Sequence, residues 1–250
     1  MPCALVLSAG GMFGAYQAGA WNVLSRNPMP DLVVGASAGA LNGWAIAGGC
    51  SAADLIDMWL DPATALLMKP RFPLVPWNGV FDPAALERQV SDWYTRFKPL
   101  VPYSLTLVQE PRLRLVRVPS EQITPRHLMA SCAIPFGYPP VRIDGKVYVD
   151  GGLLDALPVW AAAEMGATRA IAVNALPLMP SRLLRAAVQV VRRVGQKPVK
   201  HAGLEVVPIS PRGPLGSVRD AIVWNVLGYP APGTCGGPTG FWAQPPAEAR

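Results

Sequence analysis

Short apolar runs alternate with helical patterns along most of the chain. Apolar residues in short runs bounded by glycine, proline or polar residues predict strands, and apolar positions three and four residues apart predict helices. The predicted strands are 3–8, 32–34, 105–108, 113–118, 141–143, 146–149, 169–175 and 204–209. The predicted helices are 15–24, 40–47, 51–60, 83–97, 124–133, 158–165, 181–193 and 215–227. This order predicts a single α/β domain, with a central mixed, mainly parallel sheet flanked by helices.

Two stretches show neither the helical spacing of apolar residues nor the short apolar runs of strands. Residues 61–82 contain prolines at 62, 70, 73 and 76 between irregular apolar residues, and a loop this long in a compact domain is usually functional. The segment fits a lid or the wall of an acyl-chain groove, and equally a surface loop folded onto the core. Residues 229–250 are rich in proline and glycine, so we expect a domain over 1–228 followed by a separate tail.

The predicted helix 181–193 is both amphipathic and basic. Leucine, alanine and valine residues share one face, and four arginines lie elsewhere. Such a helix fits two positions, one on an anionic membrane surface and one covering a sheet.

Length and charge narrow the class of protein. With 250 residues, of which 51% are hydrophobic, the chain can bury a sizeable core. The net charge of +6 comes from scattered, mainly arginine residues, without the Lys/Arg tract typical of nucleic-acid binding. We therefore expect no nucleic-acid partner, whereas peripheral contact with an anionic membrane is compatible with this charge.

The sequence predicts neither an export signal nor a membrane span, and we expect a cytoplasmic protein. The N-terminus lacks a basic segment before its apolar run 4–7, and the uncharged stretch 32–53 contains five glycines. The four cysteines, Cys3, Cys50, Cys132 and Cys235, form no CxxC pair and have no metal-ligand spacing. We expect reduced, structural cysteines, and no metal or cofactor.

The strongest chemical signal is the sequence Gly-Ala-Ser-Ala-Gly at 35–39, between a predicted strand and a predicted helix. In a Gly-x-Ser-x-Gly turn, Gly35 and Gly39 leave room for a sharp backbone that places the hydroxyl of Ser37 at the N-terminus of the helix. The helix end favours any anion that forms there. The five residues alone fit equally well a turn of small residues with a buried serine.

A glycine-rich loop follows the first predicted strand, at 9–14. Without side chains in the way, the backbone N–H groups of Gly10, Gly11 and Met12 can bind an oxyanion or a phosphate. A dinucleotide site is disfavoured, because Ala9 occupies the first glycine position and no acidic residue follows at the required distance. With Ser37 one crossover later, an oxyanion hole explains the loop better than a plain tight turn does.

A third motif, Asp150-Gly151-Gly152, follows the predicted strand 146–149. The strand places Asp150 at its end, and the two glycines let another backbone approach closely. An aspartate in this position is commonly a turn former, so its chemical interest depends on the other two motifs.

Together these motifs resemble the patatin-like phospholipase family. The three blocks occur in the family's order, and the flanking segments 14–19, 130–135 and 155–158 agree with it, so that the resemblance covers about 4–175. It implies that Ser37 is a nucleophile, that Asp150 is its partner in a Ser–Asp dyad, and that the N–H groups around Gly10, Gly11 and Met12 form an oxyanion hole. The remaining motif glycines are Gly14, Gly35, Gly39, Gly151 and Gly152.

Two positions depart from the family pattern. Ala9 replaces the first loop glycine, and Phe13 stands where a basic residue is usual. The absent cation bears on rate and headgroup preference more than on the fold.

The resemblance implies a serine esterase that cleaves carboxylic esters of lipids, phospholipids among them, through an acyl-enzyme. One alternative is an α/β-hydrolase or acyltransferase with a Ser–His pair, which would need one of the only two histidines, His127 or His201. A second alternative, suggested by Ala9 and Phe13, is a catalytically idle lipid-binding protein.

Overall fold

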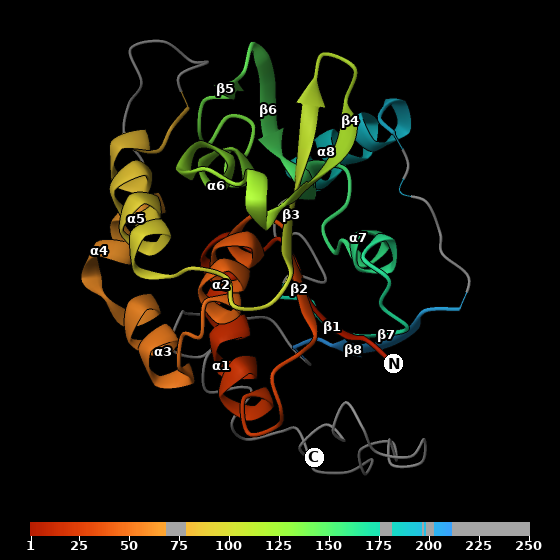
Figure 1. Ribbon diagram of the computed structural model, residues 1–250. Helices are drawn as coiled ribbons and strands as arrows, with labels where there is room; N and C mark the ends of the chain where they lie inside the picture. Colours follow the sequence, from red (N-terminus) through yellow and green to blue (C-terminus); the bar gives the residue numbers. More distant parts are fainter. Residues whose placement is uncertain (69–78, 176–181, 197, 199–202, 212–250) are drawn as a thin grey trace, which may run out of the picture.

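The fold is built on one eight-stranded sheet (Figure 1). The computed structural model describes residues 1–68, 79–175, 182–196, 198 and 203–211. The strands are β1 (Cys3–Leu7), β2 (Leu32–Gly35), β3 (Tyr103–Glu110), β4 (Arg114–Pro119), β5 (Val141–Ile143), β6 (Lys146–Asp150), β7 (Arg169–Val173) and β8 (Glu205–Ile209).

The sheet is mixed, as the sequence predicted. Its strands follow the order β5-β6-β3-β2-β1-β7-β8, with β4 paired to β3 outside this path. The pairs β1–β2, β1–β7, β2–β3 and β7–β8 are parallel, whereas β3–β4, β3–β6 and β5–β6 are antiparallel.

Strands β2 and β6 lie end to end along one edge of β3. Strand β4 pairs with β3 over Ser104–Gln109 and so occupies the other edge beside both of them. Because β2 runs parallel and β6 antiparallel to β3, their C-terminal ends point toward each other. Gly35 ends β2 opposite Leu105, and Asp150 ends β6 opposite Leu107. One residue of β3, Thr106, separates the two partner positions.

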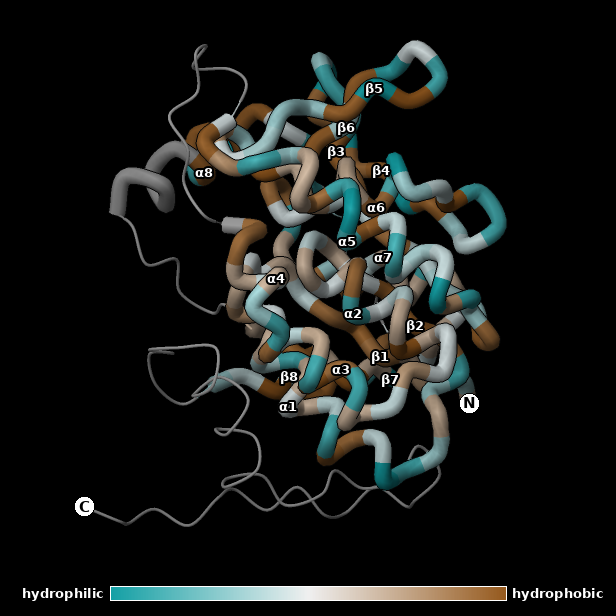
Figure 2. Tube along the Cα trace, turned by 90° about the vertical axis from the view of Figure 1, so that its left-hand side faces the viewer, coloured by the Kyte–Doolittle hydropathy of each residue, from teal (hydrophilic) through white to brown (hydrophobic). Residues whose placement is uncertain are grey.

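Helices cover both faces of the sheet (Figures 1 and 2). On one face Leu5 and Leu7 of β1 pack into the larger core, and on the other Ala4 and Val6 pack into a smaller one. The helices of the larger core are α1 (Gly14–Leu24), α2 (Ala38–Ala47), α3 (Ala52–Leu60), α5 (Pro83–Arg96) and α6 (Pro125–Ser131). Helices α7 (Val159–Glu164) and α8 (Arg182–Val194) lie on the other side. Short helices complete the fold: α4 (Pro62–Ala65), η1 (Gly11–Phe13), η2 (Leu66–Met68), η4 (Ser120–Gln122) and η5 (Gly151–Leu153).

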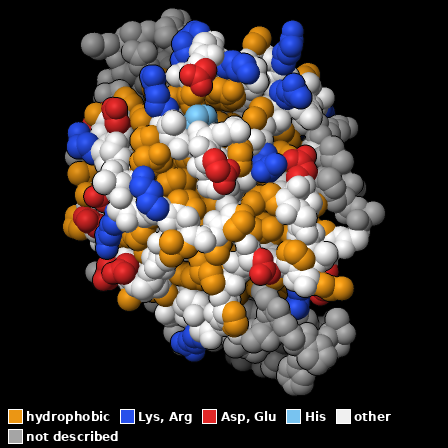
Figure 3. Space-filling model, viewed as in Figure 1, with side chains coloured by type: hydrophobic (Ala, Val, Ile, Leu, Met, Phe, Trp, Pro, Cys, Tyr) orange, Lys and Arg blue, Asp and Glu red, His pale blue; other side chains and the backbone are white. Residues whose placement is uncertain are grey.

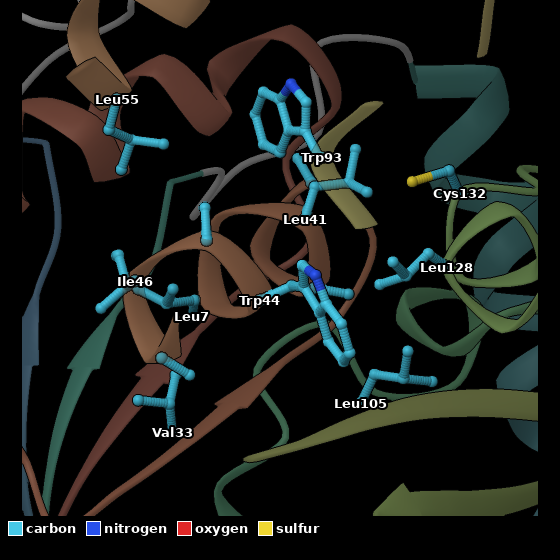
Figure 4. Close-up of a cluster of buried hydrophobic side chains, with 14 of the residues drawn as sticks. Leu7, Val33, Leu41, Trp44, Ile46, Leu55, Trp93, Leu105, Leu128 and Cys132 are labelled. Carbon is cyan, nitrogen blue, oxygen red and sulfur yellow. The ribbon is translucent and has the colours of Figure 1, made fainter. Parts of the chain in front are cut away.

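Helix α2 is the centre of the larger core, and all of its residues are buried. Side chains from the strands and from α5 and α6 surround it (Figure 4). Trp44 stacks on Tyr94 at 5.1 Å between ring centroids and meets the edge of Tyr103 at 5.7 Å. Burial on every side fixes this helix, and with it the turn that precedes it.

The predicted loop 61–82 is partly helical, which corrects the sequence interpretation. Asp61 accepts a hydrogen bond from the Ala63 N–H at 2.8 Å and caps α4, whose first residue is Pro62. The α4 and η2 segments are each a single turn, too short to show an amphipathic period. Residues 69–78 lie outside the described residues, as do the predicted helix 215–227 and the tail 229–250, so the boundary at 228 stays a prediction.

Two of the cysteines, Cys50 and Cys132, are free and buried, as expected for structural cysteines. Cys235 lies outside the described residues. In the described ranges, no helix has both the length and the apolar character to cross a bilayer.

Candidate active site

Ser37 lies on a strained turn between β2 and α2. Its φ of 56° and ψ of −128° are rare for a residue with a side chain, and it occupies the N-cap of α2 while only 2% exposed. A Cβ at Gly35 would lie 2.1 Å from the carbonyl oxygen of Gly39, and a Cβ at Gly39 would lie 2.4 Å from that of Leu7. Both flanking positions therefore require glycine.

A buried hydroxyl from α6 holds the Ser37 backbone. The N–H of Ser37 donates to Oγ of Ser131 at 2.9 Å, and both residues are buried. This bond satisfies a donor at the strained residue and fixes its peptide plane. The sequence interpretation used the segment around Ser131 only as a flanking match, because nothing local shows that this hydroxyl meets Ser37.

Asp150, at the end of β6, is only 4% exposed. Its N–H donates to the Ala133 carbonyl at 3.1 Å, and its Oδ1 accepts from the Gly152 N–H at 2.7 Å. Burial raises the pKa of this carboxyl to about 7, and hydrogen bonds from the Ser37 side chain and the Gly152 N–H partly oppose the rise. The structure thus brings Ser37 and Asp150 together.

Of the two glycines after Asp150, Gly151 packs against neighbouring backbone and Gly152 packs against side chains. A Cβ at Gly151 would lie 2.4 Å from the Thr106 carbonyl oxygen, and one at Gly152 would lie 2.5 Å from the Cβ of Ala9. The turn is thereby held between β3 and the glycine-rich loop. The close approach of another backbone that the sequence predicted is found at Gly151, whereas at Gly152 the close neighbour is the Ala9 side chain.

The glycine-rich loop lies against the first turn of α2. A Cβ at Gly14 would lie 2.8 Å from the Cβ of Ala38. Gly11 has a φ of 53°, which favours glycine, and the Phe13 N–H closes the turn onto the Gly10 carbonyl at 3.0 Å. Within the described ranges, the N–H groups of Gly10, Gly11 and Met12 have no hydrogen-bond acceptor. Backbone N–H groups of such a loop are the kind of donor that an oxyanion hole uses.

The two departures from the family pattern have structural roles. The Ala9 N–H donates to the Ala156 carbonyl at 2.7 Å, while its Cβ fills the space beside Gly152. Phe13 is half-buried and packs against the larger core, where a cation would be poorly accommodated.

A buried polar network supports the glycine-rich loop and was not predicted. The Asn42 amide donates to the Gly14 carbonyl at 2.9 Å and to Oε1 of Gln17 at 2.8 Å. Asn42 also accepts from the Trp59 indole N–H at 2.8 Å, and Gln17 donates to the Ser8 carbonyl at 2.7 Å. The network connects α1, α2, α3 and the end of β1, which rigidifies the loop.

The histidine alternative finds no support from His127. This residue caps the start of α6, where its Nδ1 accepts from the Thr124 N–H at 3.2 Å, and burial lowers its pKa. It lines an open hollow of about 630 Å³ along β4, β5 and β6, to which neither Ser37 nor Asp150 belongs. His201 lies outside the described residues.

No group of side chains suited to a metal was found in the part of the chain that the structure describes.

A known protein family and several solved structures resemble this chain. The family model described as Patatin-like phospholipase matches residues 5–163. The crystal structure of VipD from Legionella pneumophila has a TM-score of 0.50 at 14% identity, covering 90% of this chain and 65% of that one. The crystal structure of the type III effector protein ExoU has a TM-score of 0.35 at 16% identity, covering 77% of this chain and 52% of that one.

The likeness to VipD shows a shared fold. The chain spans less than two thirds of the length of either of these two structures. No match was found among curated proteins.

Proposed function

Because the chain belongs to the patatin-like phospholipase family, we propose that it hydrolyses carboxylic esters of lipids, with Ser37 as nucleophile and Asp150 as base. The observation that carries the proposal is the meeting of β2 and β6 along β3, which puts a strained serine beside a buried aspartate. The N–H groups of the adjacent loop, which have no acceptor among the described residues, would complete the set of groups that acyl transfer needs.

In the first half of the proposed reaction, Asp150 takes the hydroxyl proton of Ser37 as Oγ attacks the ester carbonyl. The carbonyl oxygen becomes an oxyanion, which accepts hydrogen bonds from the N–H groups of Gly10, Gly11 and Met12. Collapse of this intermediate breaks the ester bond, and the leaving alcohol or lysolipid takes the proton from Asp150. An acyl group remains on Ser37.

In the second half, water attacks the acyl-enzyme. Asp150 takes a proton from this water, the same N–H groups stabilise the second oxyanion, and Ser37 recovers its proton as the fatty acid leaves. Loss of one oxyanion donor typically lowers the rate by about 10²–10³.

The environment of Asp150 supports its role as base. An ordinary aspartate is too weak to take a hydroxyl proton efficiently, whereas burial raises the pKa of Asp150 to about 7. A base is most effective when its pKa lies near the working pH. We further propose that residues 1–228 form the catalytic domain.

Replacing Ser37 by alanine tests the proposal. We expect turnover of a soluble p-nitrophenyl ester to fall by more than about 10³-fold, and covalent labelling by a fluorophosphonate to disappear. The matched control is Ser91→Ala, which changes an exposed serine on α5 and should leave both readouts unchanged. A wild-type protein that neither turns over esters nor reacts with the fluorophosphonate would instead support the idle lipid-binding alternative.

A further inference from the structure

The outward face of α8 exposes two valines one turn apart. Val190 is 60% exposed and Val194 is 74% exposed. By contrast, Val188 is buried and Val191 packs into the smaller core. The helix therefore has a second apolar strip, directed away from the protein, in addition to the one that holds it in place.

Positive charge lies beside this strip and near its C-terminal end. The α8 sequence contains four arginines and no acidic residue, and Arg193 is exposed. The N–H of Gln196 donates to the Leu113 carbonyl at 3.1 Å, which fixes the end of α8 beside a turn flanked by exposed Arg112 and Arg114. No ion pair involves these three arginines within the described ranges. Figure 3 shows Lys and Arg side chains at the upper edge of the molecule, over β4, β5 and β6, with an acidic side chain among them.

The inward face of α8 is attached to the turn that follows Asp150. Arg192 donates from Nε to the Leu153 carbonyl at 3.2 Å and from Nη2 to the Gly152 carbonyl at 3.3 Å. Gly195 packs against the side chain of Leu154, where a Cβ would lie only 2.4 Å away. The exposed valines thus belong to the helix that touches the candidate active site.

We propose that the outward face of α8 docks on the surface of an anionic phospholipid bilayer. Val190 and Val194 would enter the boundary between headgroups and acyl chains, and Arg193 with Arg112 and Arg114 would pair with lipid phosphates. Exposed apolar residues combined with exposed positive charge fit such a surface better than a neutral one. The inference rests on the proposed function, since it concerns where that reaction meets its substrate.

Docking in this way has a geometric consequence. Because Arg192 and Gly195 hold α8 on the turn after Asp150, the bilayer would lie about one helix diameter, roughly 10 Å, from that turn. The site would then take its lipid directly from the membrane.

Vesicle co-sedimentation tests the proposal. We expect the full chain to bind phosphatidylcholine vesicles containing about 30 mol% phosphatidylglycerol, and to bind pure phosphatidylcholine vesicles much more weakly. The double variant V190S/V194S should lower the affinity for anionic vesicles at least about tenfold, and Arg193→Gln should lower it by a smaller factor. The matched control is Leu100→Ser, which changes a residue that is 78% exposed between α5 and β3, and it should bind like the wild type.

Turnover of a soluble p-nitrophenyl ester separates docking from catalysis. All three variants should keep wild-type turnover of this ester and a wild-type circular dichroism spectrum. Unchanged vesicle binding by V190S/V194S, or an equal loss in Leu100→Ser, would overturn the docking proposal while leaving the proposed function intact. A wild-type protein that binds no vesicle would also overturn the docking proposal, and would favour a protein partner for the outward face of α8. If the wild type binds vesicles but turns over no ester, the proposed function fails instead.

Discussion

At the scale of single residues, the candidate site depends on groups held in unfavourable states. Ser37 has a left-handed backbone, and Asp150 is a carboxyl removed from water. Each of these states destabilises the folded protein and at the same time gives the side chain the reactivity that the proposed chemistry needs.

The pH dependence of turnover should follow Asp150. A base must be deprotonated, so kcat/KM for a soluble ester should rise with pH up to about 7 and level off above it, because burial raises the pKa of Asp150 to about 7. Initial rates from pH 5 to 9 measure this. A kcat/KM that is already constant from pH 5 upward would show that the base is an ordinary carboxylate.

The raised pKa of Asp150 also predicts that Asp150→Asn is inactive yet stable. Since the pKa of Asp150 is higher folded than unfolded, the folded state binds more protons, and stability is lost as pH rises from the ordinary value of 3.8 to about 7. Asparagine does not ionise, so the melting temperature of the variant relative to the wild type should increase over this interval. A constant difference between pH 4 and 8 would contradict the assignment.

Ser131 should act on Ser37 through the backbone. Ser131→Ala leaves the buried N–H of Ser37 without its acceptor, which typically costs about 1–3 kcal/mol of stability. We expect kcat to fall with little change in KM, because the nucleophile loses its orientation while the substrate contacts stay. Ser131→Thr keeps the hydroxyl and should recover part of kcat. Equal losses in both variants would indicate a packing role only.

At the scale of elements, the site is assembled from turns pressed against one another. The Asp150 turn touches the glycine-rich loop through Gly152 and Ala9, and that loop touches α2 through Gly14 and Ala38. A change in one turn should therefore be corrected by a complementary change in its neighbour.

A double substitution measures this contact. Gly152→Ala would place a Cβ 2.5 Å from the Cβ of Ala9 and 3.1 Å from Oδ1 of Asp150, so we expect loss of both stability and turnover. Ala9→Gly removes the first clash and should restore part of the loss, with a coupling free energy of about 0.5–3 kcal/mol in a double-mutant cycle. Urea unfolding of the wild type, the two single variants and the double variant measures this coupling free energy. Additive losses of stability would mean that the two turns are not in contact.

Elements with a local cause could be predicted from the sequence. The strand, turn and helix around Ser37 follow from apolar runs and glycines within a few residues, and Pro83 after the Asp82 cap marks the start of α5. The short helix α4 was not predicted, because one turn shows no periodicity. The contacts of Ser131 and Asn42 join residues 94 and 28 positions apart, and no pattern in one sequence reveals such a pair.

At the scale of the whole molecule, the class of sheet was predictable but its strand order was not. Alternating strands and helices indicate a mainly parallel sheet, and the Asp144-Gly145 hairpin predicts an antiparallel addition. The joining of these parts along one edge of β3 depends on tertiary packing. That Ser37 and Asp150 would meet was therefore an implication of family resemblance.

The choice between a dyad and a triad involves the whole chain, since it has only two histidines. We expect His127→Ala and His201→Ala each to keep turnover within about tenfold of the wild type, which corresponds to about 1.4 kcal/mol of barrier. His127 caps α6 and lines a hollow away from Ser37. Loss of activity in His201→Ala, with the circular dichroism spectrum unchanged, would favour a triad.

Because β2 and β6 meet end to end along β3, the part of β3 between their ends sets the spacing of Ser37 and Asp150. Lengthening the chain at the Asp144-Gly145 turn, at the far end of β6, leaves the spacing of Ser37 and Asp150 untouched. One residue inserted beside Thr106 would instead move the two strand ends apart by about 3.4 Å and turn every later side chain of β3 to the opposite face. In evolution and in engineering alike, insertions in this protein should therefore be tolerated in its hairpins and rejected within a single strand.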